Sequence, residues 1–153
     1  EYLKEFLEQV VAQVGKQYLE LSEEEGAVKL GDLTMKVIIE HQRVLLEKLH
    51  IKFDRWYSER DLHAADKVAD VLSEFQKHGM SYESEGALWL KTKELGDERD
   101  RVLRKSSGST TYLANDSAYH LDKYRRGYDL MINIWGADHH GQVPGLKGAM
   151  KAL

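Results

Sequence analysis

Residues 130–135, Leu-Met-Ile-Asn-Ile-Trp, constrain the fold of this chain more than any other segment. A nearly continuous apolar run of this length is typical of a strand that is buried on both faces of a parallel sheet. A helical pattern precedes it over residues 118–126, and a short β-favouring run over residues 111–114 lies before that helix. Another helix is expected near Pro144. The last third of the chain therefore predicts a strand–helix–strand–helix unit with parallel strands.

Polar residues accompany both predicted strands. In a unit of this kind ligands bind at the carboxyl ends of the strands, so we expect the two polar clusters to meet at one edge of the sheet. This edge is the candidate site. Its residues are Tyr112, Asp116, Gly136, Asp138, His139 and His140.

The first two thirds of the chain predict helices and then a small sheet. Apolar residues repeat at helical spacing over residues 3–14, 30–49 and 62–78, and Ser22 followed by three glutamates is typical of a helix start. Residues 51–57 favour a strand. Closely spaced short runs separated by turns predict an antiparallel meander. These runs are residues 80–82, 87–92 and 101–105.

Composition excludes several classes of protein. The chain has 153 residues and no cysteine, so it carries neither a disulfide framework nor a thiolate metal site. It contains neither a signal-peptide pattern nor an apolar stretch approaching the ~20 residues that span a bilayer. A net charge of −4 argues against a stand-alone nucleic-acid binder, which usually presents a basic surface. We expect a cytoplasmic protein that does not enter a membrane.

Several blocks of the sequence resemble one family. Residues 112–141, which contain Tyr-Leu-Ala-Asn-Asp and Trp-Gly-Ala-Asp-His-His-Gly, resemble the catalytic domain of arginyl-tRNA synthetase, a class I aminoacyl-tRNA synthetase. Residues 53–59, 86–92 and 96–103 match the same family in the same order, so the resemblance covers essentially the whole chain. Two class I signatures, His-x-Gly-His and the Lys-Met-Ser-Lys-like loop, do not occur in the sequence. The resemblance implies an internal fragment, and ends without an initiator Met or a polar tail agree with that expectation.

The resemblance implies an α/β fold. We expect residues 1–153 to be a single segment of a Rossmann-like nucleotide-binding domain, with N-terminal helices and a parallel βαβ core. Residues 80–108 are expected to be a small antiparallel β insertion, and residues 110–153 a βαβα active-site unit.

The implied function is that of an arginine–tRNA ligase. Such an enzyme activates L-arginine with ATP and Mg²⁺ to arginyl-adenylate and then transfers the arginyl group to tRNA(Arg). No tightly bound metal is expected. Since the phosphate-contacting groups of the family belong to the two absent signatures, we expect the isolated chain to be inactive. A non-catalytic arginine- or nucleotide-binding module and a purely structural fragment are the alternatives.

The resemblance also implies roles for the candidate residues. Tyr112, Asp116 and His140 would hold arginine, because a carboxylate binds a planar guanidinium through paired charge-assisted hydrogen bonds. Gly136, Asp138 and His139 would hold the adenosine of ATP, and no residue of this chain is expected to be catalytic.

Simpler roles remain open for the same residues. From position alone Asp116 is a good helix N-cap. Gly136 and Asp138 fit an ordinary turn, and Ser58 and Glu59 fit either the active edge or a helix cap. A metal site formed by the pair His139 and His140 with Asp138 and His120 is disfavoured, because adjacent residues on a helix point about 100° apart.

Overall fold

The computed structural model describes residues 2–15 and 17–153, and the chain divides into two compact units, residues 1–56 and 57–153. Glu1 and Lys16 lie outside the described residues.

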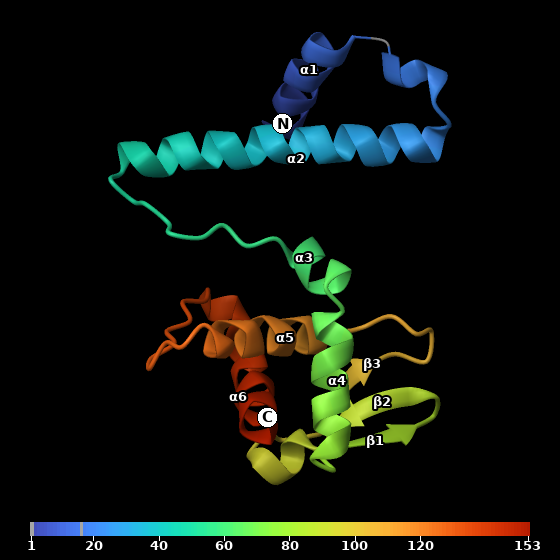
Figure 1. Cartoon of the computed structure of the whole chain (residues 1–153), viewed down its shortest axis with the longest axis vertical. Helices are drawn as coiled ribbons and strands as arrows, with labels where there is room; N and C mark the ends of the chain where they lie inside the picture. Colours follow the sequence, from blue (N-terminus) through green and yellow to red (C-terminus); the bar gives the residue numbers. More distant parts are fainter. Residues whose placement is uncertain (1, 16) are drawn as a thin grey trace. The chain divides into compact units, whose positions relative to one another are not determined.

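The helices predicted in the first unit are present (Figure 1). Helix α1 (Tyr2–Val14) buries Val10 and is followed by Gly15 with φ +61°, a conformation that favours glycine at a helix end. The turn η1 (Gln17–Glu20) leads to helix α2 (Glu23–Lys48). Ser22 and Glu25 form a reciprocal capping box, so the helix start predicted at Ser22 is confirmed, and α2 continues from there through the apolar pattern predicted over residues 30–49.

The strand predicted over residues 51–57 is wrong. This segment has no regular secondary structure. Its aromatic residues contact each other and the preceding helix instead: the rings of Phe53 and Trp56 lie 5.4 Å apart, and the Arg43 guanidinium lies 5.0 Å from the Trp56 ring. β-favouring residues form a strand only where a neighbouring strand accepts their hydrogen bonds, and no described strand pairs with this segment.

The second unit opens with two helices where the sequence predicted one. Helix α3 (Glu59–Ala64) and helix α4 (Lys67–Lys77) are separated by Asp66, whose φ of +51° breaks the helical backbone. The apolar face predicted for α4 is confirmed, and Gly79 ends the helix with φ +68°. The residues of that buried face are Val68, Val71, Leu72 and Phe75.

The predicted antiparallel meander is confirmed. Strands β1 (Ser81–Ser84), β2 (Ala87–Leu90) and β3 (Arg101–Arg104) pair in the order β1-β2-β3, and the turn η2 (Thr92–Leu95) lies between the last two. One face of this sheet packs into the main core. Its most completely buried side chains include Leu88, Leu90 and Leu103, together with Phe75 of α4.

The strand predicted over residues 111–114 is also wrong. Thr111 has an extended backbone, and helix α5 (Tyr112–Arg125) begins at the next residue. The small residues Ala114 and Ala118 lie buried at i, i+4 spacing, so the tight packing of one helical face outweighs the weak β preference of a four-residue run. The predicted glycine stop is confirmed, because Gly127 follows α5 with φ +82°.

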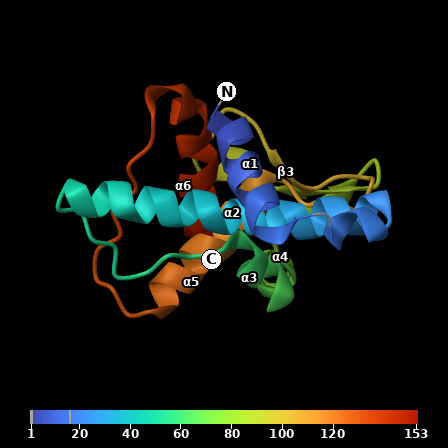
Figure 2. The ribbon, with the colours of Figure 1, turned by 90° about the horizontal axis from the view of Figure 1, so that it is seen from above.

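Residues 130–135 are neither a strand nor buried. They form an extended connection without regular secondary structure, visible in Figure 2 as an open loop from α5 toward α6. The side chains of Leu130 and Ile132 are each 74% exposed and that of Ile134 is 92% exposed. The described residues contain no parallel pair of strands, so the expected parallel βαβ core is not formed. The α/β class holds only in the coarser sense of helices with a small antiparallel sheet.

Two short elements complete the second unit: the turn η3 (Ala137–Gln142) and helix α6 (Val143–Ala152). Helix α6 approaches η2 closely through a glycine. A Cβ atom at Gly148 would lie 3.1 Å from Cγ2 of the buried Thr92. The absence of a side chain at this position therefore allows the two elements to pack together.

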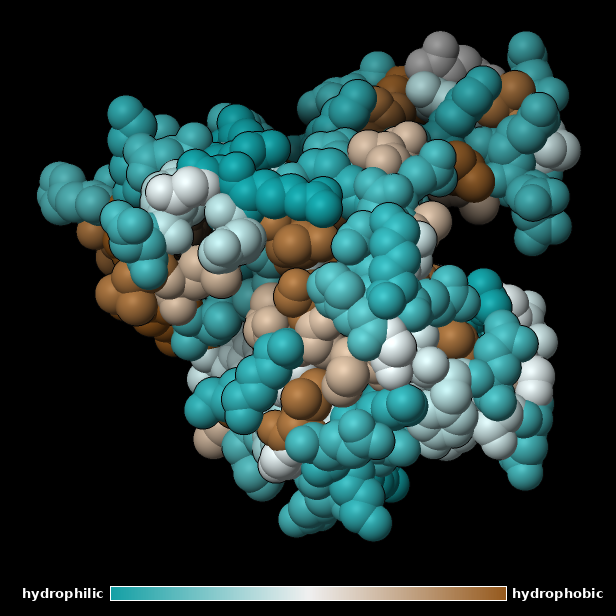
Figure 3. Space-filling model, turned by 60° about the horizontal axis from the view of Figure 1, so that its bottom comes forward, coloured by the Kyte–Doolittle hydropathy of each residue, from teal (hydrophilic) through white to brown (hydrophobic). Residues whose placement is uncertain are grey.

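The surface is mixed in character. In Figure 3 hydrophobic residues lie exposed among hydrophilic ones. By their exposed fractions, Leu130, Ile132 and Ile134 are among the exposed apolar side chains of the chain. None of the described helices has the length and apolar character that crossing a membrane requires.

Candidate functional site

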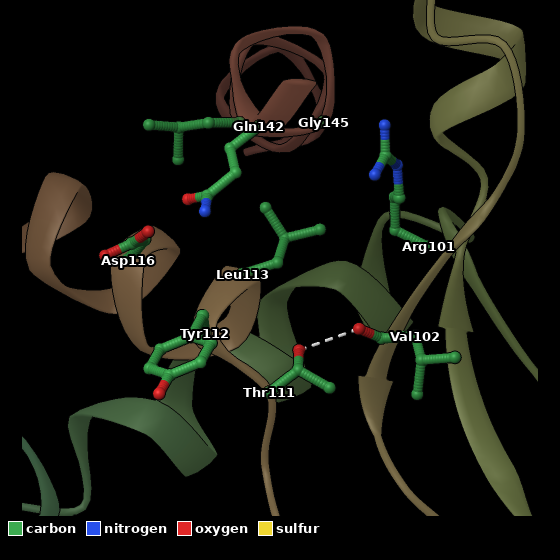
Figure 4. Close-up of a pocket in the computed structure, with 9 residues that line it drawn as sticks. Arg101, Val102, Thr111, Tyr112, Leu113, Asp116, Gln142 and Gly145 are labelled. Carbon is green, nitrogen blue, oxygen red and sulfur yellow. Dashed lines mark hydrogen bonds between the residues drawn. The ribbon is translucent and has the colours of Figure 1, made fainter. Parts of the chain in front are cut away.

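Asp116 lies where three hollows of the second unit meet. The largest of the three has a volume of about 610 Å³ and is lined by residues from α5, the 130–135 segment and η3. A second is lined by Arg101 and Gly145 among others (Figure 4), and a third lies between α3 and α5. Four of the six predicted site residues line the largest hollow: Tyr112, Asp116, Gly136 and His139. The side chains of Asp138 and His140 do not line it.

Helix α5 presents Tyr112 and Asp116 on one face, because they are four residues apart. The Tyr112 side chain is 81% exposed, so its ring lies at the rim of the hollow rather than in the core. Asp116 falls in the second turn of the helix, where it has no capping role. The cap interpretation of Asp116 is therefore wrong, and the carboxylate faces the hollows instead.

The electrostatic setting of Asp116 favours a cationic ligand. Partial burial raises the pKa of the Asp116 carboxyl above its ordinary value, the charge of Glu59 raises it further, and nearby His120 and Lys123 act in the opposite direction. A cation bound in contact with Asp116 would offset the cost of burying its negative charge.

Glu59 is a second carboxylate at this site, and the sequence left its role open. It lines the hollow between α3 and α5 together with Asp116, Tyr57 and Tyr119. Its Oε1 accepts a hydrogen bond from Nδ2 of Asn115 at 2.6 Å. Ser58 is the N-cap residue of α3 but makes no side-chain capping bond, and Glu59 is the first residue of that helix. A role of either residue at the active edge stays a prediction.

The turn η3 holds the other candidate residues. Gly136 precedes the turn, and a Cβ atom there would lie 2.5 Å from Oδ1 of Asp138. The glycine thus leaves room for the Asp138 carboxylate beside the backbone. Nδ1 of His140 donates a hydrogen bond to the Ala137 carbonyl at 3.1 Å, while Nε2 of His139 lies 3.6 Å from the Asp138 carboxylate.

Arg101 and Gln142 are site residues that sequence reasoning missed. Both line the hollow drawn in Figure 4, Arg101 from β3 and Gln142 from the end of η3. Gln142 also donates from Nε2 to Nδ1 of His139 at 3.3 Å. The available signal for Arg101 was its place in the matched block of residues 96–103. Gln142 lies just beyond the block of residues 112–141, and periodicity alone does not distinguish either residue from surface residues.

The described residues include no group of three or more histidine, aspartate and glutamate side chains arranged to hold a metal ion. Both ring nitrogens of His120 have partners of their own: Nδ1 contacts the Asp116 carbonyl and Nε2 contacts the Asn133 side chain.

Comparison with known proteins decides the family. Residues 4–139 match the family model described as tRNA synthetases class I (R), catalytic domain. The chain belongs to the class I arginyl-tRNA synthetase family. This membership confirms the resemblance inferred from the blocks around Asp116 and Gly136.

Curated arginyl-tRNA synthetases are similar along the whole chain. The chain is 41% identical over 153 residues to an arginine–tRNA ligase of Geobacter sp. (strain M21) and 42% identical over 153 residues to that of Bacillus pumilus (strain SAFR-032). It spans 28% of the length of each of these relatives.

A solved structure has the same fold. A crystal structure from Campylobacter jejuni that is assigned to arginyl-tRNA synthetase matches 99% of this chain with a TM-score of 0.86 and 38% identity. The match covers 33% of that chain. The arrangement of elements described above is therefore that of an arginyl-tRNA synthetase segment.

Proposed function

We propose that this chain is part of a cytoplasmic arginine–tRNA ligase and supplies its pockets for arginine and for the adenosine of ATP. The enzyme would join the arginine carboxylate to the α-phosphate of ATP, release pyrophosphate, and pass the arginyl group to tRNA(Arg). The observation that carries the proposal is the convergence of Tyr112, Asp116, Gly136 and His139 on one hollow, in a chain similar to relatives named for this activity.

The proposed arginine pocket centres on two carboxylates. Asp116 and Glu59 line the same hollow, and the charge of Glu59 raises the pKa of Asp116. A guanidinium is planar and always charged, and it presents paired N–H donors that match carboxylate oxygens. Binding it would satisfy both carboxylates at once. Tyr112 at the rim would pack on the aliphatic part of the substrate, and His140 would approach from η3.

The proposed adenosine pocket lies at the start of η3. The Asp138 carboxylate is largely exposed and has no described role in stabilising the fold beyond its approach to His139, so its oxygens are available to accept ribose hydroxyls. Gly136 keeps the backbone open beside it, and His139 lines the hollow that Asp116 shares. This arrangement would bring the α-phosphate of an ATP bound by its adenosine close to the arginine carboxylate, which would attack it with release of pyrophosphate.

Residues 130–135 would complete a parallel, Rossmann-like sheet with strands from the rest of a longer enzyme. Their side chains already alternate as in a strand. Leu130, Ile132 and Ile134 are exposed, whereas the intervening Met131, Asn133 and Trp135 line a hollow beside α6. Pairing with a neighbouring strand would bury Leu130, Ile132 and Ile134. The proposed ligand pockets do not depend on that burial.

The catalytic groups that contact phosphate are proposed to lie outside this chain. Its sequence contains neither His-x-Gly-His nor a Lys-Met-Ser-Lys-like loop. The described residues offer no cluster that fits Mg²⁺, so we assign no step to that ion here. The 153 residues should therefore show no ATP–pyrophosphate exchange above the level of an Asp116→Ala variant.

A two-dimensional NMR titration with L-arginine tests the proposal. We expect saturable shifts at the amides of Asp116 and Glu59, no comparable shifts with L-lysine, and their loss in Asp116→Ala. L-citrulline, which has the shape of arginine without its charge, should also fail to bind. Equal shifts with arginine, lysine and citrulline would contradict recognition of the guanidinium.

A further inference from the structure

The turn η3 lacks a hydrophobic anchor. None of the residues of Ala137–Gln142 is buried, and the residues that lead into it, 132–136, are also exposed. A segment with few buried contacts is usually mobile. The proposed adenosine pocket nevertheless depends on a fixed position of Gly136, Asp138 and His139. Something other than core packing must hold the turn.

One connection precedes the turn and runs to α5. The Lys123 ammonium donates a hydrogen bond to Oδ1 of Asn133 at 2.8 Å and lies 3.2 Å from Nε2 of the buried His120. Nδ1 of His120 donates to the Asp116 carbonyl at 2.7 Å, which leaves Nε2 as an acceptor. Lys123 therefore joins two acceptors, Nε2 of His120 and Oδ1 of Asn133, that lie 3.0 Å apart.

A second connection follows the turn and runs to β3. Nη2 of Arg101 donates to the Gly141 carbonyl at 3.3 Å. The same guanidinium is fixed by Asp97, with Nε to Oδ2 at 2.7 Å and Nη2 to Oδ1 at 3.0 Å. The Asp97 side chain is 1% exposed, so this ion pair has a buried base rather than a freely moving surface partner. A hydrogen bond from a guanidinium held in this way places the carbonyl firmly.

We propose that these two connections, Lys123–Asn133 before the turn and Arg101–Gly141 after it, position η3 for adenosine. This inference rests on the proposed function for its consequence, but the ordering of the turn is a property of the ligand-free chain. Lys123, Asn133 and Arg101 are positioning residues, since they act on the pocket through the backbone of residues 133–141. The connections attach the turn to α5 on one side and to β3 on the other, and so couple it to the helix that carries Asp116.

The test measures backbone order of the whole 153-residue chain by ¹⁵N relaxation. Asn133→Ala is the main variant, because residue 133 is exposed and its loss should not disturb folding. Arg101→Lys is the second, because it keeps a cation for Asp97 but removes Nη2, the atom that donates to the Gly141 carbonyl. Either variant should lower the order parameters of residues 136–141 from about 0.85 to below about 0.6 while α4 stays rigid.

Arg104→Lys is the matched control. Arg104 lies on the same strand and pairs with an exposed carboxylate, Glu83, away from the turn. It should leave the order of residues 136–141 unchanged, and Lys123→Arg, which retains a donor for Asn133, should preserve most of it. Unchanged order in both Asn133→Ala and Arg101→Lys, or an equal loss in Arg104→Lys, would overturn the proposal.

Adenosine titrations separate this inference from the proposed function. Each main variant should weaken adenosine binding by about two- to tenfold, the net worth of one hydrogen bond. If the turn becomes mobile as expected but wild-type protein does not bind adenosine, the two connections stand and the proposed function is wrong. If adenosine binds equally to the wild type and to variants with a mobile turn, the positioning role is overturned while the pocket stands.

Discussion

Replacing Gly136 by alanine tests the adenosine pocket at a single atom. The added Cβ would lie 2.5 Å from Oδ1 of Asp138, where an ordinary contact is 3.4–4 Å. The carboxylate must therefore retreat by about 1 Å, which is enough to break a hydrogen bond to a ribose hydroxyl. A hydrogen bond to a charged group contributes about 1.5–3 kcal/mol, so the Kd for adenosine should rise about tenfold to a hundredfold.

Gly141→Ala is the control for this substitution. Gly141 lies in the same turn, and a Cβ there would meet nothing within 4 Å. Both positions are exposed, so the free energy of unfolding should change by no more than about 0.5 kcal/mol in either variant. Isothermal titration calorimetry with adenosine, beside thermal unfolding, gives both quantities. Equal adenosine affinity in the two variants would refute the reasoning.

Three further outcomes follow from the structure. The pKa of Asp116 is raised above its ordinary value of 3.8, and its ionised form is needed to bind a guanidinium, so on acidification the Kd for L-arginine should begin to rise at a higher pH than an ordinary aspartate would give. An Asp116→Asn variant should bind L-arginine weakly and without this pH dependence. A wild-type Kd that stays constant down to pH 4 would contradict the prediction. Gly148→Ala should lower the free energy of unfolding of the second unit by about 1 kcal/mol, since overpacking against the buried Thr92 costs about 1–3 kcal/mol and the helix preference of alanine returns about 1 kcal/mol. Thr92 cannot move away easily because its hydroxyl donates a hydrogen bond to the Arg99 carbonyl at 2.8 Å. Increased stability of the variant in urea denaturation would count against this packing. Hydrogen bonds from Arg101 lower the pKa of Asp97 in the folded chain. The stability that this pair contributes is therefore fully present above the pKa of Asp97 in the unfolded chain, and it should be lost as the pH falls below about 4 through the lowered pKa of the folded chain. Asp97→Asn should flatten that part of the pH–stability curve, and an unchanged curve would contradict the assignment.

Local signals were read correctly from the sequence. The capping box at Ser22 and the glycine ends at Gly79 and Gly127 each depend on a few neighbouring residues, and all three lie where the sequence placed them. The meander was predicted for the same reason, because turn residues mark the ends of its short strands. Helix caps and turns involve residues that are close together in the sequence, so the local sequence is enough to predict them.

Non-local pairing was not predictable from the same patterns. Residues 51–57 and 130–135 have strand-like composition, but a strand forms only with a partner, and no described strand lies beside either of them. The short run over residues 111–114 was predicted to be a strand, and packing of Ala114 and Ala118 decided for the helix. That decision moved Asp116 from a predicted cap to the second turn of α5.

The candidate site was predicted in its residues more than in its geometry. The family resemblance singled out Tyr112, Asp116, Gly136 and His139, which surround one hollow although the sheet edge that was to bring them together is not formed. Arg101 lay in a matched block and carried no periodic signal of its own. Its position beside Gly141 depends on the fold of residues that are 40 positions apart in the chain. The roles of all these residues in binding remain predictions.

The most direct test of the central claim is competition by a non-hydrolysable arginyl-adenylate analogue. If one continuous site holds both arginine and adenosine, the analogue should displace each ligand separately and bind more tightly than either, because the two halves are linked. Asp116→Ala and Gly136→Ala should each weaken the analogue. An analogue that displaces only one ligand, or neither, would contradict the account of a shared site around Asp116.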